Sequence, residues 1–134
     1  MSLYLDTSAL LKRYVAEEDS DACERILVAD PTWITARHTR VEVLRNLAAL
    51  LRGTERTRMK RAFRADWDRT HVVEIDAATC ERAGDLAETL RVQTLDALHL
   101  AAAERTGGAA LTFVTYDIRQ AQAARSLGWR VVGR

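Results

Sequence analysis

Short apolar runs alternate with longer segments in which apolar residues recur every three or four positions. The short runs have the length and the aromatic or β-branched content of β-strands. The longer segments have the period of an α-helix with one buried face. Strands are expected at residues 3–5, 33–35, 71–75, 111–115 and 130–132. Helices are expected at residues 8–15, 20–29, 41–51, 54–68, 77–90, 95–105 and 118–127.

Strands that alternate with helices along a chain predict a parallel sheet, because each connection must cross a face of the sheet to reach the start of the next strand. Five such strands predict the α/β class, with a five-stranded parallel sheet and helices on both of its faces. The chain of 134 residues shows no repeat, low-complexity tract or linker. Its length suits one hydrophobic core, so we expect a single domain over residues 1–134.

Charge and cysteine content narrow the classes of function. The 20 basic and 19 acidic residues leave a net charge of +1, which excludes binding of polyanions through bulk charge, so any basic surface must be local. Cys23 and Cys80 have no CxxC spacing and no histidine at zinc-finger spacing. The N-terminal segment reaches the charged Asp6 too early for a signal peptide or a membrane span. These features favour a soluble protein of the reducing cytoplasm.

Three aspartates lie where predicted strands end or predicted helices begin. Asp6 follows the first strand, Asp117 follows the fourth, and Asp96 opens the helix at 95–105. Each alone fits a helix cap. In parallel sheets, however, ligands bind beyond the carboxyl ends of the strands. Hydroxyl groups of Ser8 and Thr115 accompany Asp6 and Asp117, and three such positions in one small domain favour a shared acidic pocket.

Glu42 has a different position in the pattern. Val43, Leu47 and Leu50 form the apolar stripe of their helix, and Glu42 falls well away from it. Spacing alone therefore predicts an exposed carboxylate. Asn46, one turn later, lies on the same helix face and is placed to hydrogen-bond Glu42.

The three histidines do not form a recognised catalytic motif. His38, His71 and His99 make no HExxH pair, and the chain has no glycine-rich phosphate-binding loop, which disfavours zinc hydrolases and nucleotide-binding proteins. His99 stands between two leucines one turn after Asp96. We expect it to be a packed, hydrogen-bonded residue outside the site.

Four segments of the sequence resemble, in order and separation, the motifs of PIN-domain ribonucleases, and in particular the VapC-like toxins of type II toxin–antitoxin systems. The segments are LYLDTSALLKRY (3–14), RVEVLRNLAALL (40–51), TLDALHLAAA (94–103) and FVTYDIRQAQAARSLGW (113–129). The resemblance covers essentially the whole chain. It implies a three-layer α/β/α fold, an endoribonuclease that depends on Mg²⁺ or Mn²⁺, a small cognate antitoxin and a homodimer.

The resemblance also implies which residues form the site. By motif position, Asp6, Glu42, Asp96 and Asp117 match the acidic quartet of the family. Ser8 and Thr115 match the hydroxyl positions that accompany the first and last acids. Some relatives add a carboxylate two positions after the last acid, where this chain has Arg119. The number of metal ions in the active state is therefore open.

One segment, from Arg52 to Arg64, is densely basic. A solvated helix face, a surface for RNA phosphates, and a contact for the antitoxin or a second subunit all fit it. The candidate RNA-binding residues are Arg56, Arg58, Lys60, Arg61 and Arg64.

Three other functions compete with that of a toxin nuclease. A PIN-domain nuclease that processes RNA without a toxin role keeps the same chemistry. A non-catalytic α/β interaction module keeps only the fold. A phosphoacceptor receiver domain is disfavoured, because Thr7 follows Asp6 where an adjacent acidic pair is needed, and neither lysine lies near the last strand. No motif encodes the RNA target.

Overall fold

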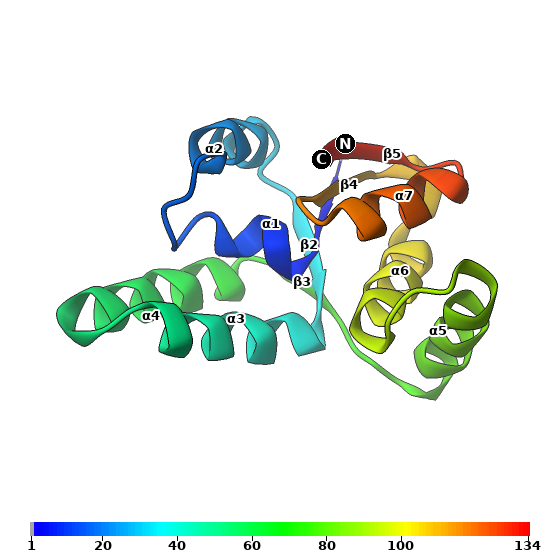
Figure 1. Cartoon of the computed structure of the whole chain (residues 1–134), viewed down its shortest axis with the longest axis horizontal. Coiled ribbons are helices and arrows are strands. Elements are labelled where there is room, and N and C mark those ends of the chain that lie inside the picture. Colours follow the sequence, from blue (N-terminus) through cyan, green and yellow to red (C-terminus); the bar gives the residue numbers. More distant parts are fainter. Residues whose placement is uncertain (1) are drawn as a thin grey trace.

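The computed structural model describes residues 2–134 and confirms the expected α/β fold, with a five-stranded parallel sheet between helices (Figure 1). The strands are β1 (Leu3–Leu5), β2 (Trp33–Ala36), β3 (His71–Val73), β4 (Thr112–Thr115) and β5 (Arg130–Gly133). The helices are α1 (Thr7–Leu11), α2 (Ser20–Ala29), α3 (Arg37–Leu50), α4 (Gly53–Asp68), α5 (Ala77–Leu90), α6 (Thr94–Thr106) and α7 (Ile118–Ser126), with a short 3₁₀ turn at Gly108–Ala110.

The strand order β3-β2-β1-β4-β5 determines where a site can form. From β1 the chain builds the sheet outward through β2 and β3, and it then crosses to the other side of β1 for β4 and β5. The in-register pair Leu3 and Thr112 joins β1 to β4. This reversal of direction is the topological switch point of the sheet, and the carboxyl ends of β1 and β4 leave a crevice there for ligands.

Two hydrophobic cores hold the helices against the sheet. Because successive strand residues point to opposite faces, Leu3 and Leu5 pack with apolar residues of α1 to α4, whereas Tyr4 packs with those of α5, α6 and α7. In Figure 1, α1 to α4 lie on one side of the strands, and α5 and α6 lie on the other. The strands are thus buried on both faces, as a parallel sheet requires.

The first helix is shorter than predicted, because the chain turns after Leu11 instead of continuing to residue 15. The turn brings two neighbouring side chains to a buried carboxylate of α4. Arg13 Nε donates to Asp66 Oδ2 at 2.8 Å, and Tyr14 Oη donates to the same oxygen at 2.6 Å. The turn therefore ties the β1–α1 segment to α4 through a buried, charge-assisted network.

The α3 helix begins at Arg37, four residues earlier than predicted, and its buried face differs from the predicted stripe. Val43 and Leu47 are buried as expected, but the side chain of Leu50 is exposed. Gly53, which lies between the two predicted helices, opens α4 with φ +59°. Over residues 2–134 every helix is too short or too polar to cross a membrane.

Candidate functional site

A pocket of about 250 Å³ lies at the switch point, beyond the carboxyl ends of β1 and β4. Other hollows on the surface are larger, so volume does not single this pocket out. Its lining does, because four carboxylates from separate segments of the chain meet in it. The lining residues are Asp6, Thr7, Ser8, Leu11, Glu42, Asn46, Asp96, His99 and Asp117.

Asp6 is the most buried of the four acids, with 4% of its surface exposed. It caps α1, because Oδ1 accepts from the backbone N–H of Ala9 at 3.1 Å. The hydroxyl of Ser8 donates to Oδ1 at 2.7 Å, and that of Thr115 donates to Oδ2 at 2.5 Å. Burial raises the pKa of Asp6, and His99 and these hydrogen bonds oppose the increase. Asp6 is therefore both the N-cap of α1 and a carboxylate of the pocket.

Asp117, two residues after the end of β4, likewise caps a helix and lines the pocket. Its Oδ1 caps α7 by accepting from the backbone N–H groups of Arg119 at 2.9 Å and Gln120 at 3.3 Å. The backbone N–H of Asp117 donates to Thr115 Oγ1 at 3.1 Å. Thr115 thus connects the first and the last acid, which explains the hydroxyl at this position.

Asp96 is not a helix cap, because Gln93 occupies the cap position of α6. The half-buried Asp96 carboxyl lies in the first turn of α6 and lines the pocket. Burial raises the pKa of Asp96, and the negative charges of Asp117, Asp6 and Glu42 raise it further, against the effect of a nearby histidine. The acids are therefore close enough to repel one another.

Glu42 lies in the pocket, so the exposure predicted from its helical spacing is wrong. Its side chain is only 23% exposed, because the β1–α1 junction covers it. Thr7 Oγ1 donates to Glu42 Oε1 at 2.5 Å, and His99 Nε2 lies 3.1 Å from the same oxygen. Burial acts to raise the pKa of Glu42, but these two hydrogen bonds outweigh it and hold the pKa below its usual value. Asn46 donates to the backbone carbonyl of Glu42, not to its carboxylate.

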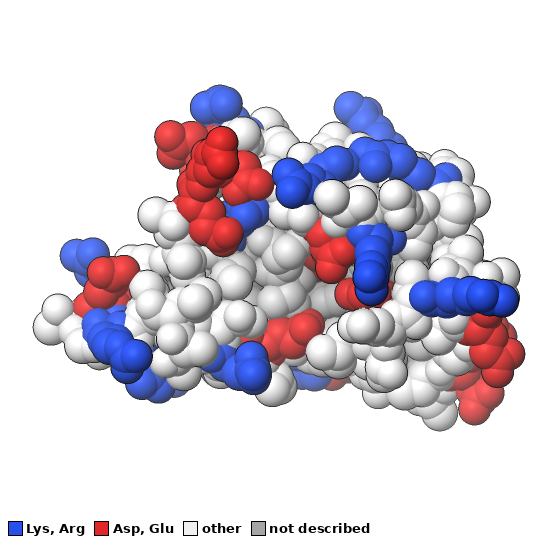
Figure 2. Space-filling view, in the orientation of Figure 1, with Lys and Arg blue, Asp and Glu red and all other residues white. Residues whose placement is uncertain are grey.

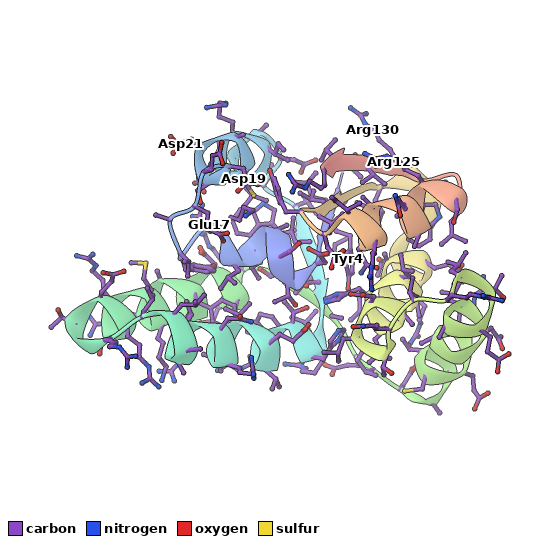
Figure 3. The ribbon with its side chains drawn as sticks, viewed as in Figure 1. Tyr4, Glu17, Asp19, Asp21, Arg125 and Arg130 are labelled. Atoms are coloured by element: carbon purple, nitrogen blue, oxygen red, sulfur yellow. The ribbon has the colours of Figure 1, made fainter. Side chains whose placement is uncertain are left out.

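His99 is buried and hydrogen-bonded, as expected, but its exclusion from the site is wrong because the ring lines the pocket. Nδ1 lies 2.9 Å from the hydroxyl of Tyr4, a buried residue at the centre of the molecule (Figure 3). The opposite nitrogen, Nε2, faces Glu42. The three-residue step from Asp96 to His99 places both on one helix face, and this spacing is the signal that could have placed His99 in the pocket.

His38 is a further residue near the pocket that sequence reasoning left out. Its ring centroid lies 4.3 Å from that of His99, and its Nε2 lies 3.6 Å from Glu42 Oε1. Burial lowers the pKa of His38 to about 4, and His99 adds to this effect against the opposing influences of Glu42 and the Leu95 backbone. The ring is therefore neutral at pH 7. The four-residue step from His38 to Glu42 is the signal in the sequence.

The acidic part of the pocket suits a hard divalent cation. Mg²⁺ and Mn²⁺ prefer carboxylate, hydroxyl and water oxygens, and the four acids supply such oxygens from β1, α3, α6 and the end of β4. Burial raises the pKa of Asp6, whereas the pKa of Asp96 is raised by burial and by the charges of the other three acids, so negative charge is crowded around Asp96. A bound cation would relieve that repulsion.

The basic residues of α4 do not line this pocket. Arg56, Arg58, Arg61 and Arg64 are exposed, and Lys60 is half-buried. Figure 2 shows basic side chains on the α3–α4 part of the molecule, at its left end, and acidic side chains near the centre. The two features are therefore separate surfaces of the protein.

Comparison with known proteins gives the family. The family model described as PIN domain matches residues 3–126. The protein named Ribonuclease VapC46, from Mycobacterium tuberculosis, is 35% identical over 131 residues, which cover 98% of this chain and 96% of that protein. Ribonuclease VapC35 of the same organism is 36% identical over 134 residues, covering 97% of this chain and 95% of that protein.

Solved structures agree with this assignment at the level of the fold. FitAcB from Neisseria gonorrhoeae has a TM-score of 0.74 at 18% identity and covers 98% of this chain and 96% of its own. A toxin–antitoxin complex from Klebsiella pneumoniae has a TM-score of 0.73 at 18% identity, with 99% and 97% covered. The family model and the two relatives establish that the chain belongs to the PIN-domain family and that VapC ribonucleases are among its relatives.

Proposed function

We propose that this PIN domain, spanning residues 1–134, is an endoribonuclease that depends on a divalent metal ion and acts as the toxin of a toxin–antitoxin pair. The observation that carries the proposal is the convergence of four carboxylates on one pocket at the switch point of the sheet. The names of the relatives support ribonuclease activity. The toxin–antitoxin complex from Klebsiella pneumoniae, which has the same fold, supports the toxin role.

Each acid would have its own task. Asp6 and Asp96 would hold the cation directly, with Asp117 as an outer ligand or as a ligand of a second ion. The bound cation, Mg²⁺ or Mn²⁺, would acidify a water molecule and neutralise the scissile phosphate. Glu42 is kept ionised by Thr7 and His99, so it can accept a proton from the attacking water.

The hydroxyl groups would orient the site. Ser8 and Thr115 each donate to a different oxygen of Asp6, which holds its carboxylate in one position and leaves the remaining lone pairs for a cation. Arg119 stands where some relatives have a further carboxylate, so a second ion in this chain would have Asp117 as its acidic ligand.

For substrate binding we propose that the exposed face of α4 attracts RNA phosphates. Its arginine side chains match phosphate oxygens in geometry, and their positive charge would offset the repulsion between the acidic pocket and RNA. If charge reversal on this face changes only the binding of an antitoxin or a second copy of the chain, the face belongs to that partner.

The proposed partners are a small antitoxin, encoded beside this gene, and a second copy of the chain in a homodimer. Their setting would be the cytoplasm, where RNA is found. Co-expression should give a tight complex that does not cleave RNA. Normal growth of cells that express the active chain without a partner would instead favour an RNA-processing role.

RNA cleavage by conservative variants tests the proposal. Asp6→Asn and Asp96→Asn keep the size of the side chain but remove a negative ligand, so cleavage in Mg²⁺ should fall by about 100-fold or more. Asp85→Asn is the matched control, because Asp85 is exposed on α5. Asp76 is less suitable, since it caps α5 and pairs with Arg105. Cleavage by both site variants at the rate of Asp85→Asn would mean that these acids do not carry the reaction. Absence of cleavage by the parent protein itself would favour a non-catalytic interaction module.

A further inference from the structure

Three side chains with metal-binding atoms meet beside the acidic pocket. His38 and Glu42 lie one turn apart on α3, and His99 comes from α6. One ligand atom from each lies within 4.8 Å of the others. Two imidazoles and one carboxylate differ from the all-oxygen acidic quartet. Imidazole suits zinc, copper, nickel and iron, whereas Mg²⁺ prefers oxygen.

The spacing of these atoms is close to that of a tetrahedral zinc site. Glu42 Oε1 lies 3.1 Å from His99 Nε2 and 3.6 Å from His38 Nε2. Ligand atoms about 2.0–2.1 Å from a tetrahedral zinc ion are about 3.3–3.4 Å from one another. The two imidazole rings already lie side by side, with centroids 4.3 Å apart. Small side-chain movements therefore separate this arrangement from a three-ligand site.

His38 gives an independent indication of a ligand. Within residues 2–134 neither of its ring nitrogens makes a hydrogen bond of normal geometry, although both atoms are buried and the Leu95 backbone is near enough to act on the ring. A buried polar atom without a partner costs free energy and calls for an explanation. The contact between Glu42 and His99 does not require His38. A metal ion at this position would bind a lone pair of a His38 ring nitrogen.

The surroundings of His99 orient it as a zinc ligand. Histidines that bind metals usually make a hydrogen bond through the other ring nitrogen, which fixes the tautomer and the ring. His99 does so, because Nδ1 lies 2.9 Å from Tyr4 Oη and Nε2 points at Glu42. Glu42 and His99 also line the pocket, which gives water or substrate access to the fourth coordination position.

We propose that His38, Glu42 and His99 form a binding site for a transition-metal ion of the Zn²⁺ class, separate from the Mg²⁺ or Mn²⁺ position of the acidic quartet. Glu42 is the only one of the three that also belongs to that quartet. Zn²⁺ at the histidine pair therefore withdraws Glu42 from the acidic site. The consequence, which rests on the proposed nuclease function, is that Zn²⁺ inhibits RNA cleavage.

Zinc binding is tested without reference to cleavage. The exposed thiol of Cys80 would bind Zn²⁺ on its own, so all proteins carry Cys80→Ser. Calorimetric titration with Zn²⁺ alone should show one site, and His38→Gln should weaken its affinity by about tenfold or more, because even an outer partner of a zinc ligand contributes that much. His71→Gln, at an exposed histidine of β3, and Asp96→Asn should keep the affinity of the parent.

Co²⁺ gives a second measurement with a structural readout. In the parent protein it should develop the intense visible absorption of four-coordinate cobalt, and His38→Gln should lose this absorption while it keeps the circular dichroism spectrum of the folded chain. His99→Gln should also lose the cobalt absorption, provided that its circular dichroism spectrum shows a folded chain. Equal affinity of the His38→Gln and His71→Gln proteins for Zn²⁺, or no binding by the parent, would overturn the proposed site.

Inhibition is then measured in saturating Mg²⁺. For each protein, the cleavage rate with Zn²⁺ is divided by the rate of the same protein without Zn²⁺. The cleavage rate of the parent should fall by about tenfold or more, since the carboxylate base is withdrawn, and a chelator of Zn²⁺ should restore it. The His38→Gln ratio should stay near one. If the parent binds Zn²⁺ but cleaves no RNA, the nuclease proposal fails and the zinc site stands. If it cleaves equally well with Zn²⁺ bound, the shared use of Glu42 is wrong.

Discussion

Replacement of Thr115 by valine tests whether the pocket holds Asp6 as an ionised group. Thr115 is fully buried, and its hydroxyl donates to Asp6 Oδ2 at 2.5 Å. Valine keeps the branched shape and removes the donor to Asp6, together with the acceptor of the Asp117 backbone N–H, whose contribution does not depend on the charge of Asp6. A hydrogen bond to a charged group contributes about 1.5–3 kcal/mol, so the free energy of unfolding should fall by about 2 kcal/mol at neutral pH. For a chain of this length the melting temperature should fall by about 5–10 °C.

The size of this loss should depend on pH. Burial raises the pKa of Asp6, and the hydrogen bond from Thr115 is one of the contacts that oppose the increase. Removal of this donor raises the pKa of Asp6 further in the folded variant. The loss of stability is therefore complete above the folded pKa of the variant, and it shrinks as the pH falls through the folded pKa values of the two proteins, because a protonated Asp6 no longer loses a charge-assisted bond.

Thr35→Val is the matched control for this variant. Thr35 is also fully buried in the sheet, but its hydroxyl donates to a neutral acceptor, the carbonyl of Leu5, at 2.6 Å. It should lose about 1 kcal/mol at every pH. Urea unfolding followed by circular dichroism over a pH series measures both variants. If Thr115→Val loses the same free energy at all pH values, as Thr35→Val does, Asp6 is not held as an anion by this hydroxyl.

Two further predictions concern cleavage and substrate binding. Glu42→Gln should lower cleavage by about 100-fold or more in a chain that still folds, because glutamine still accepts a hydrogen bond but is no base. Its melting temperature should fall at neutral pH, since the lowered pKa means that ionised Glu42 stabilises the fold. Wild-type cleavage would mean that Glu42 is only a structural residue of α3. Arg58→Glu with Arg61→Glu should weaken RNA binding and reduce its salt slope by about one per residue. The control with Arg25→Glu and Arg130→Glu, at exposed positions of α2 and β5, should bind as the parent does. If only complex formation with an antitoxin or a second copy changes, the α4 face belongs to a partner.

The order of strands and helices could be predicted from the sequence because local pattern determines it. Apolar runs and helical periods depend on nearby residues, and all five strands and seven helices occur close to their predicted positions. The exceptions are set by contacts far along the chain. The turn after Leu11 is fixed by Asp66, more than fifty positions away, and no local pattern contains that information.

The candidate site divides in the same way. Asp6 and Asp117 follow strands, so the topology of a parallel sheet was enough to bring them to one edge. Glu42 was misjudged by helical phase, because an apolar stripe predicts which face meets the core but not that Thr7 and His99 cover the adjacent face. The resemblance to PIN-domain proteins placed Glu42 in the quartet for a reason that spacing could not supply. The position of His38 depends on how α3 and α6 meet, which only the folded structure gives.

Metal-linked stability is the most direct test that the four acids form one cation site. Burial and the neighbouring acids raise the pKa of Asp96, so ionised Asp96 destabilises the metal-free fold as the pH rises, and Asp96→Asn removes this penalty. Without metal at neutral pH the variant should therefore melt no lower than wild type.

With Mn²⁺ the order should reverse. An ion that binds only the folded state, at about 100 times its dissociation constant, adds about 2.7 kcal/mol, or about 10 °C in a chain of this size. Both proteins in this measurement carry Cys80→Ser and His38→Gln, and one of them also carries Asp96→Asn. Thermal melts of the two are recorded with and without Mn²⁺ at constant ionic strength. We predict a large rise in melting temperature for the protein that keeps Asp96, reversed by EDTA, and a small rise for the Asp96→Asn protein. Equal shifts in both proteins, or none in either, would mean that the four carboxylates do not form one metal site.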